Sequence, residues 1–160
     1  MGFDRSAIEK EVQHWFFDIY FNHWVDIGAG RRPNEGPEFV LQYWGTPMFA
    51  TADEPAMAAW LMEGKQIVDF LVMQHEVLMA GGYDHTEVPD QKIFVYNQDG
   101  ASIEVIWSRQ AADNTEIQRF VVHFEVARME GVWKVVGVQA RTTVRDIDNG
   151  SIDAAWAQGE

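Results

Sequence analysis

The stretch IEVIWSRQAADNTEIQRFVVHFEVAR, residues 103–128, decides the fold because two β-prone runs flank one turn signal at Asp113-Asn114. Apolar and polar side chains alternate with a period of two in both runs. A two-residue loop at this turn places Trp107 opposite Phe120, so the two runs predict an antiparallel hairpin. The same register gives five further pairs: Val105 with Val122, Ile103 with Phe124, Glu104 with His123, Ile106 with Val121, and Ser108 with Arg119.

A second turn signal, Glu130-Gly131, adds a third strand, GVWKVVGVQAR, at residues 131–141. This turn places Val135 opposite Val126, on the face that also holds Trp107. It further pairs Gly137 with Phe124 and Gln139 with Val122. Two independently chosen turns therefore put the same residues on the same face, which supports the register.

The two predicted faces of this sheet differ in character, and we expect helices to cover the more apolar one. That face comprises Phe94, Tyr96, Ile103, Val105, Trp107, Phe120, Val122, Phe124, Val126, Trp133 and Val135, with Arg109, Gln139 and Arg141 at a polar end. The opposite face comprises Ile93, Val95, Glu104, Ile106, Val121, His123, Glu125, Val136, Val138 and Ala140. This second face is too apolar for a fully hydrated surface, so we expect it to pack against another subunit.

Helical periodicity dominates the first half of the chain. Side chains recur at helical spacing at Ile8, Val12, Trp15, Ile19 and His23. They predict one long amphipathic helix that starts near a capping box, Ser6 with Glu9, and ends at Gly28. A short helix is expected within residues 37–44 and a short strand at 45–51.

A second helical region is expected after Thr51, which has capping-box spacing with Glu54. AMAAWLM (56–62) and KQIVDFLVMQHEVLMA (65–80) both have helical character, with a bend expected near Gly64. Because helices come first and strands second, the sequence predicts an α+β fold.

Composition narrows the classes of function. The chain of 160 residues fits one domain, residues 1–160, with its core in about 6–144 and a tail at 145–160. A formal net charge of −13 disfavours nucleic acid and anionic membrane as partners. The absence of cysteine excludes disulfides and thiolate chemistry, and the five histidines show no metal-ligand spacing, so we expect no metal and no cofactor. Without a signal-peptide pattern or an apolar run near ~20 residues, a cytoplasmic location is expected.

The order of elements resembles the nuclear transport factor 2-like superfamily, over about residues 6–144. GVWKVVGVQAR (131–141) is similar to the closing segment of many SnoaL-like members, and IEVIWSR (103–109) and RFVVHFEVAR (119–128) are similar to their central paired strands. The resemblance implies a cystatin-like cone: a curved antiparallel sheet that wraps around N-terminal helices, encloses a pocket and often dimerises through its outer face.

Relatives in this superfamily include ketosteroid isomerase, scytalone dehydratase, polyketide cyclases, limonene epoxide hydrolase and non-catalytic association domains. None of the catalytic patterns of these enzymes can be placed residue by residue on this sequence. The resemblance therefore predicts the fold and carries no catalytic assignment, since one scaffold hosts many functions.

The candidates for acid/base chemistry are Asp84, His85 and His75. In Tyr83-Asp84-His85 the carboxylate can orient the imidazole, and the phenol can stabilise an oxyanion. The alternative is that these residues make turn hydrogen bonds where a helix meets a strand. His75 shares an apolar helical stripe with Ile67, Leu71 and Leu78, and it is either a core residue or a base that faces the pocket.

The predicted pocket is aromatic with one polar end. The expected ligand-binding residues are Tyr43, Tyr83, Trp107, Arg109, Phe120, Phe124, Gln139 and Arg141. Two guanidinium groups at the polar end can hold a carboxylate, and the alternative is that both form salt bridges with nearby Asp or Glu.

The sequence thus predicts a domain that binds a small apolar or carboxylate-bearing molecule. Lyase, isomerase or cyclase chemistry by proton transfer is left open. The alternative is a non-catalytic association domain. We expect a homodimer through the outer sheet face, at Glu104, Ile106, Val121, His123 and Val138.

Overall fold

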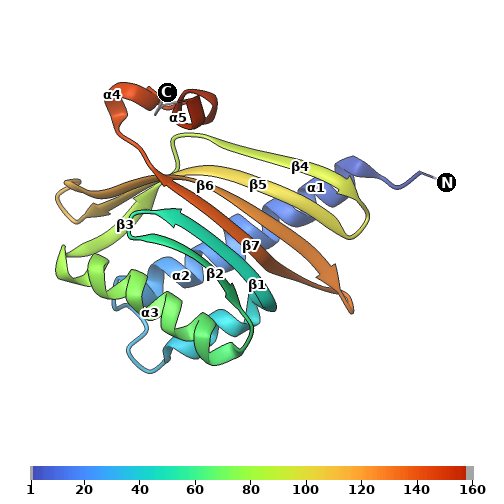
Figure 1. The fold of residues 1–160 in the computed structure, drawn as a ribbon, viewed down its shortest axis with the longest axis horizontal. Helices are drawn as coiled ribbons and strands as arrows, with labels where there is room; N and C mark the ends of the chain where they lie inside the picture. Colours follow the sequence, from blue (N-terminus) through green and yellow to red (C-terminus); the bar gives the residue numbers. More distant parts are fainter. Residues whose placement is uncertain (1, 158–160) are drawn as a thin grey trace.

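A curved sheet covers one side of the N-terminal helices in the computed structural model, which describes residues 2–157 (Figure 1). The α+β class predicted from the sequence is confirmed. The helices are α1 (Arg5–Gln13), η1 (His14–Tyr20), α2 (Phe21–Gly28), η2 (Pro37–Gln42), α3 (Gly64–Ala80), α4 (Arg145–Asp148) and α5 (Ile152–Ala157). The strands are β1 (Trp44–Asp53), β2 (Ala56–Leu61), β3 (Tyr83–Glu87), β4 (Gln91–Asn97), β5 (Gly100–Ala111), β6 (Glu116–Met129) and β7 (Val132–Thr142).

Within residues 2–157, seven strands form one sheet, and six of them follow the order β2-β1-β7-β6-β5-β3. Strand β4 also pairs with β5, at the end of β5 that β3 leaves free. All pairs are antiparallel except β1 with β7, which is parallel. The long central strands β5, β6 and β7 therefore support the shorter ones at both sides.

The predicted register of the β5–β6 hairpin is confirmed, including Trp107 opposite Phe120 and Glu104 opposite His123. The predicted register of β6 with β7 is correct for Val126 opposite Val135. It then shifts by one residue, because a β-bulge leaves Val136 of β7 without a pairing partner on β6. The observed pairs beyond it are Glu125 with Gly137, Phe124 with Val138, His123 with Gln139, Val122 with Ala140 and Val121 with Arg141.

This bulge corrects the predicted faces of β7. Because side chains alternate across a strand, one extra residue moves every later side chain to the other face. Gln139 and Arg141 therefore lie on the outer face, and the prediction that they extend the pocket side is wrong. Val138 and Ala140 take the inner positions instead.

A second irregularity corrects the faces of β4. Ile93 pairs with Ile103 and Val95 with Ala101, before the pairing shifts between Val95 and Asn97. Ile93 and Val95 consequently face the core, whereas Phe94 and Tyr96 are 56% and 50% exposed. The prediction that Phe94 and Tyr96 belong to the inner face is wrong, because the one-residue shift in pairing turns both side chains to the other face.

The segment AMAAWL forms strand β2 and is not helical as predicted. Thr51 belongs to β1 and starts no helix, and β2 returns from Glu54-Pro55 to pair antiparallel with β1. Ala, Met and Leu favour helices, but such preferences are small and strand pairing overrides them here. Helix α3 begins at Gly64, where Glu63 and Gln66 form a reciprocal capping box.

The long N-terminal helix contains a seven-residue π-helical segment, η1, between two α-helical parts. Its buried stripe repeats every four residues: Ile8, Val12, Phe16, Tyr20 and Trp24. In a regular α-helix, at about 100° per residue, such a stripe drifts by roughly 40° at each step. The wider turn of a π-helix opposes this drift and keeps the stripe facing the sheet. The predicted stripe is therefore wrong at Ile19, which is 44% exposed.

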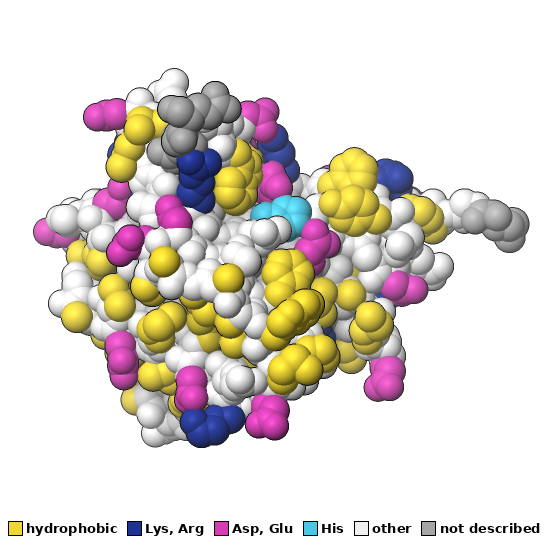
Figure 2. All heavy atoms as spheres, in the orientation of Figure 1, with side chains coloured by type: hydrophobic (Ala, Val, Ile, Leu, Met, Phe, Trp, Pro, Cys, Tyr) yellow, Lys and Arg dark blue, Asp and Glu magenta, His cyan; other side chains and the backbone are white. Residues whose placement is uncertain are grey.

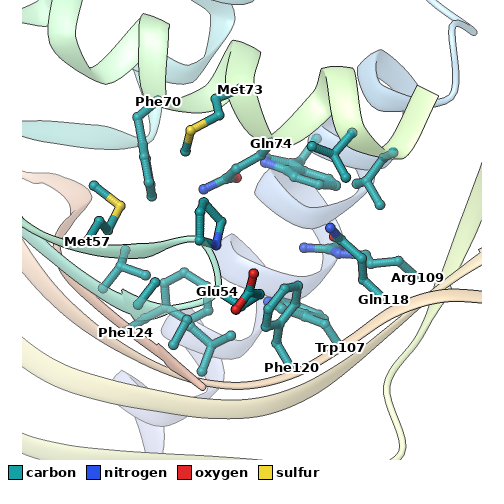
Figure 3. A pocket seen from close by; sticks show the side chains of 18 of the residues that line it. Glu54, Met57, Phe70, Met73, Gln74, Trp107, Arg109, Gln118, Phe120 and Phe124 are labelled. Carbon is teal, nitrogen blue, oxygen red and sulfur yellow. The ribbon is translucent and has the colours of Figure 1, made fainter. Parts of the chain in front are cut away.

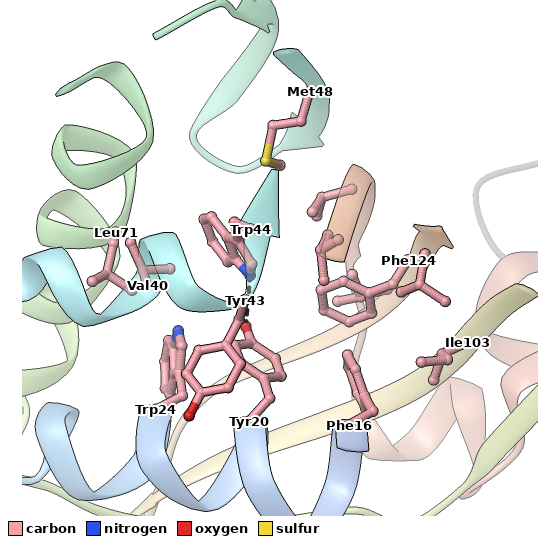
Figure 4. Close-up of a cluster of buried hydrophobic side chains, with 14 of the residues drawn as sticks. Phe16, Tyr20, Trp24, Val40, Tyr43, Trp44, Met48, Leu71, Ile103 and Phe124 are labelled. Carbon is pink, nitrogen blue, oxygen red and sulfur yellow. Dashed lines mark hydrogen bonds between the residues drawn. The ribbon is translucent and has the colours of Figure 1, made fainter. Parts of the chain in front are cut away.

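This stripe forms the centre of the core. Figure 4 shows Phe16, Tyr20 and Trp24 of the helix packed against Trp44 and Phe124 of the sheet side. The start of the helix is capped by Asp4, whose side chain accepts a hydrogen bond from the Ala7 amide, and not by the predicted Ser6. No helix among residues 2–157 is long and apolar enough to cross a membrane.

The C-terminal helices α4 and α5 lie on the outer face of the sheet (Figure 1). Ile152 and Ala155 of α5 are fully buried together with Ile106 and Val121 of the sheet. The segment expected as a tail thus covers two residues of the predicted dimer surface. Val138, a third residue of that surface, faces inward, while dimerisation itself stays a prediction.

Candidate ligand-binding pocket

A cavity of ≈ 130 Å³ lies between the inner face of the sheet, helix α3 and the β1–β2 hairpin (Figure 3). The central strands contribute Trp107, Arg109, Gln118, Phe120, Val122, Phe124, Val138 and Ala140. The hairpin and α3 contribute Thr51, Ala52, Glu54, Pro55, Met57, Phe70, Met73, Gln74, Val77 and Leu78, and the N-terminal half adds Tyr20, Trp24 and Trp44. The cavity is thus largely apolar, with a few polar groups in its wall.

Four of the eight predicted ligand-binding residues line this cavity: Trp107, Arg109, Phe120 and Phe124. They are brought together because alternate residues of two paired strands point to the same side. Trp107 packs edge-on against Phe124, with ring centroids 6.2 Å apart. All four lie on β5 or β6, the two strands whose register was predicted correctly.

The other four predicted residues lie elsewhere. Tyr43 is buried in the core, where its hydroxyl lies 2.8 Å from His23 Nδ1. Tyr83 is buried against Trp24. The two residues moved by the bulge are on the outer face: Gln139 accepts a hydrogen bond from Thr51, and Arg141 donates one to the Trp156 carbonyl.

None of the predicted acid/base residues is in the wall of the cavity. Asp84 Oδ2 does lie 2.9 Å from His85 Nδ1, as the sequence suggested, but Nε2 of this ring contacts Gln110. Asp84 also faces Arg31, at 3.7 Å. These contacts hold the Asp84–His85 pair at the start of β3, outside the cavity.

His75 is a buried residue of α3 whose Nε2 has no hydrogen-bond partner among the described residues. Its ring packs edge-on against Trp24 and parallel to Phe39. Burial, together with the positive charge of Arg109, lowers the pKa of His75 to about 4. His75 is therefore a neutral core residue near pH 7, which matches the structural alternative considered for it.

Arg109 is the charged residue at the polar end of the cavity, and its side chain is almost fully buried. Its guanidinium carbon lies 4.0 Å from the ring centroid of Trp24 and 4.8 Å from that of Trp107. Nη1 donates a hydrogen bond of 2.9 Å to Thr86 Oγ1. No carboxylate among residues 2–157 forms an ion pair with it, and burial lowers the pKa of Arg109.

Tyr20 brings a second polar group to the same wall. Its hydroxyl accepts a hydrogen bond from Trp44 Nε1 at 3.1 Å (Figure 4). Burial raises the pKa of Tyr20, so the hydroxyl keeps its proton. This phenol is therefore neutral near pH 7.

Several residues of the cavity could not be expected from the sequence. Glu54, Pro55 and Met57 were placed in a helix, so their position over the inner face was missed. Tyr20 and Trp24 lay off the predicted helical stripe. The four-residue spacing of the aromatic residues in the first helix was the only signal for them. Among residues 2–157 no group of three His, Asp or Glu side chains is arranged to hold a metal ion.

Comparison with known protein families gives a match. The family described as NTF2-like protein (DUF6841) matches residues 9–143. No curated protein matches the chain.

Three solved structures illustrate the likeness in fold. An NTF2-like protein of unknown function from Pseudomonas putida KT2440 superposes with a TM-score of 0.62 at 14% identity, over 85% of this chain and 87% of that chain. The yeast UBP3-associated protein BRE5 gives 0.59 at 11% identity, over 82% and 96%. A putative ketosteroid isomerase from Parabacteroides distasonis ATCC 8503 gives 0.51 at 10% identity, over 67% and 75%. At these identities the likeness concerns the fold alone.

Proposed function

We propose that this chain, which belongs to the NTF2-like family DUF6841, binds a small and largely apolar molecule in the cavity beneath the β1–β2 hairpin. The observation that carries the proposal is the aromatic wall of that cavity, formed by Trp107, Phe120 and Phe124 on the inner face. An apolar cavity with a few placed polar groups is the usual form of a small-molecule site.

The volume of the cavity limits the size of the molecule. An apolar cavity of about 150 Å³ accommodates benzene. The cavity of ≈ 130 Å³ therefore suits one six-membered ring or a short branched chain, without movement of the hairpin. Met57 of β2 and Met73 of α3 line the cavity and have flexible side chains that can adjust to the ligand.

Proton-transfer chemistry is a second candidate, and one observation favours it. Glu54 is the carboxylate in the wall, and Figure 3 shows its oxygens turned toward the cavity. A lyase, isomerase or cyclase reaction here would use Glu54 as the base, because Asp84, His85 and His75 lie outside the wall. The reaction would require a ligand with an acidic C–H bond beside Glu54.

Association through the outer face remains the alternative to ligand binding. Figure 2 shows hydrophobic side chains on this face, around a histidine. Because Ile106 and Val121 are covered by α5, the proposed surface shifts to the side chains that stay exposed: Trp60, Phe94 and Tyr96. Dimerisation through this surface predicts a doubled mass in analytical ultracentrifugation, and a Trp60→Ser, Phe94→Ser double variant should be monomeric.

A ligand-binding test uses a filled cavity. Ala140 lies in the wall, so Ala140→Phe should occupy the space of the ligand. Titration calorimetry with toluene should give measurable binding to the wild type and at least about tenfold weaker binding to this variant. Ala58→Phe, on the exposed strand β2, is the matched control and should bind like the wild type. Absence of toluene binding to the wild type, or equal binding to both variants, would contradict the proposal.

A further inference from the structure

We propose that Arg109 is an anion-binding subsite at one end of the cavity, and that the ligand is a small carboxylate whose apolar part occupies the rest. The inference rests on the proposed function and names the chemical class of the ligand. It is carried by the surroundings of this one guanidinium group.

The first observation is that the charge of Arg109 is buried without a counter-charge. Its residue is 8% exposed, and none of the carboxylates among residues 2–157 pairs with it. The chain has 25 Asp and Glu residues against 12 Lys and Arg, so acidic partners are abundant. A buried charge is costly unless it is paired. An anion brought by the ligand would supply the missing partner.

The second observation is that the guanidinium group is held before any anion binds. The ring faces of Trp24 and Trp107 lie next to it, and Thr86 accepts a hydrogen bond from Nη1. Contacts with indole faces favour a desolvated cation. Because the group is already ordered, binding an anion costs little further side-chain entropy.

The third observation concerns the neighbouring donors. Gln118 pairs across the strands with Arg109, and Figure 3 shows the two side chains together at one end of the cavity. The Tyr20 hydroxyl, in the same wall, accepts a hydrogen bond from Trp44, and its own proton has no acceptor among the described residues. A planar guanidinium with an amide and a phenol beside it suits a planar carboxylate.

Glu54 of the β1–β2 hairpin does not supply this counter-charge. It is the carboxylate of the wall, yet it forms no ion pair within residues 2–157. The β1–β2 hairpin therefore does not neutralise Arg109 with its own side chain. The remaining wall near Arg109 is aromatic, from Trp107 and Phe120, which suits the ring of an aromatic acid.

The test compares benzoate with benzyl alcohol, two probes that share a phenyl ring and differ in charge. Titration calorimetry at low ionic strength should show that the wild type binds benzoate roughly tenfold or more tightly than benzyl alcohol, since hydrogen bonds between charged groups are stronger than those to a neutral hydroxyl. Arg109→Met should lose this preference, so that the ratio of the two affinities falls to about one. Arg109→Lys keeps the charge and should retain part of the preference.

Arg141→Met is the matched control because Arg141 lies on the outer face, and it should bind both probes like the wild type. The comparison of the two probes on the wild type needs no variant, so it decides the question even if Arg109→Met does not fold. If the wild type binds benzyl alcohol but benzoate no more tightly, the anion subsite is overturned and the proposed function stands. If neither probe binds, both proposals are overturned.

Discussion

Two arginines are buried on opposite faces of the sheet, on neighbouring strands. Arg119 of β6 faces outward, where Asp148 of α4 holds it with hydrogen bonds of 2.7 and 2.9 Å, and Glu116 adds a third at 3.1 Å. Arg109 of β5 faces inward and has aromatic rings and Thr86 in place of carboxylates. The two side chains are almost equally buried, at 6% and 8% exposure, so burial alone does not explain the difference.

Two histidines, one on each side of the sheet, differ in the same way as the two arginines. His123 on the outer face lies between Glu104 and Glu125, at 2.7 and 2.6 Å. His75 on the inner side has no partner for its Nε2 among the described residues. The outer face therefore uses its positive groups to fasten the C-terminal helices and the strands. On the inner face, Arg109 has no carboxylate partner among residues 2–157, which is the arrangement that the proposed anion subsite requires.

The largest expected effect follows from breaking the outer pair with Asp148→Asn. Asp148 is fully buried, and removal of one partner from such a pair typically costs about 3 kcal/mol or more. Burial acts to raise the pKa of Asp148, but the hydrogen bonds from Arg119, Gly150 and Thr143 lower it below the ordinary value of 3.8. The stabilisation is thus complete above about pH 4 and is lost as the pH falls through the lower folded-state pKa.

Urea unfolding from pH 7 to pH 2 would measure this loss. Wild type and Asp148→Asn should differ by a constant amount at neutral pH and converge in acid. Asp146→Asn, on the same short helix but exposed, is the control and should follow the wild type. A difference below about 1 kcal/mol at pH 7 would remove the contrast between the faces.

A smaller effect is expected at His123. Burial acts to lower its pKa, but the hydrogen bonds with Glu125 and Glu104 raise it above 6.5. The contribution of the charged imidazole is therefore present below pH 6.5 and is lost as the pH rises through the folded-state pKa. His123→Gln should destabilise by a few tenths to about 1 kcal/mol at pH 5.5 and by less at pH 9. His14→Gln, at an exposed histidine, is the control; a loss that grows with pH would refute the assignment.

The smallest effect on stability is expected at Arg109, although its effect on binding is large. Arg109→Met removes a buried charge and leaves no carboxylate of residues 2–157 unpaired, so the lost contacts with Trp24 and Trp107 are offset by the relief of desolvation. The free energy of unfolding should change by no more than about 1 kcal/mol. Equal destabilisation by Arg109→Met and Arg119→Met in urea would mean that both arginines serve the fold alone.

The sequence predicts the centre of this molecule better than its edges. The β5–β6 register follows from a strict period of two around one turn, and it leads to Trp107, Arg109, Phe120 and Phe124 in the pocket wall. The bulges in β7 and β4 cannot be predicted from that pattern. An extra residue changes which residues pair between strands, but the alternation of apolar and polar residues on either side of it is unchanged.

The β1–β2 hairpin over the pocket was not predicted, for a different reason. The alanine-rich segment Ala56–Leu61 has helical preference, and only its pairing with β1 makes it a strand. No local signal reports such a partner. The unneutralised state of Arg109 also depends on what surrounds it in space, so the sequence could not separate it from Arg141.

The π-helical segment at residues 14–20 has a consequence for aligning this chain with its relatives. A π turn corresponds to a helix that has accommodated additional backbone without losing its direction. A relative with a regular α-helix would reach the position of Trp24 with fewer residues, so the gap belongs inside residues 14–20. Placing it in the loop after Gly28 would pair Trp24 with the wrong residue and hide which relatives share the aromatic face above Arg109.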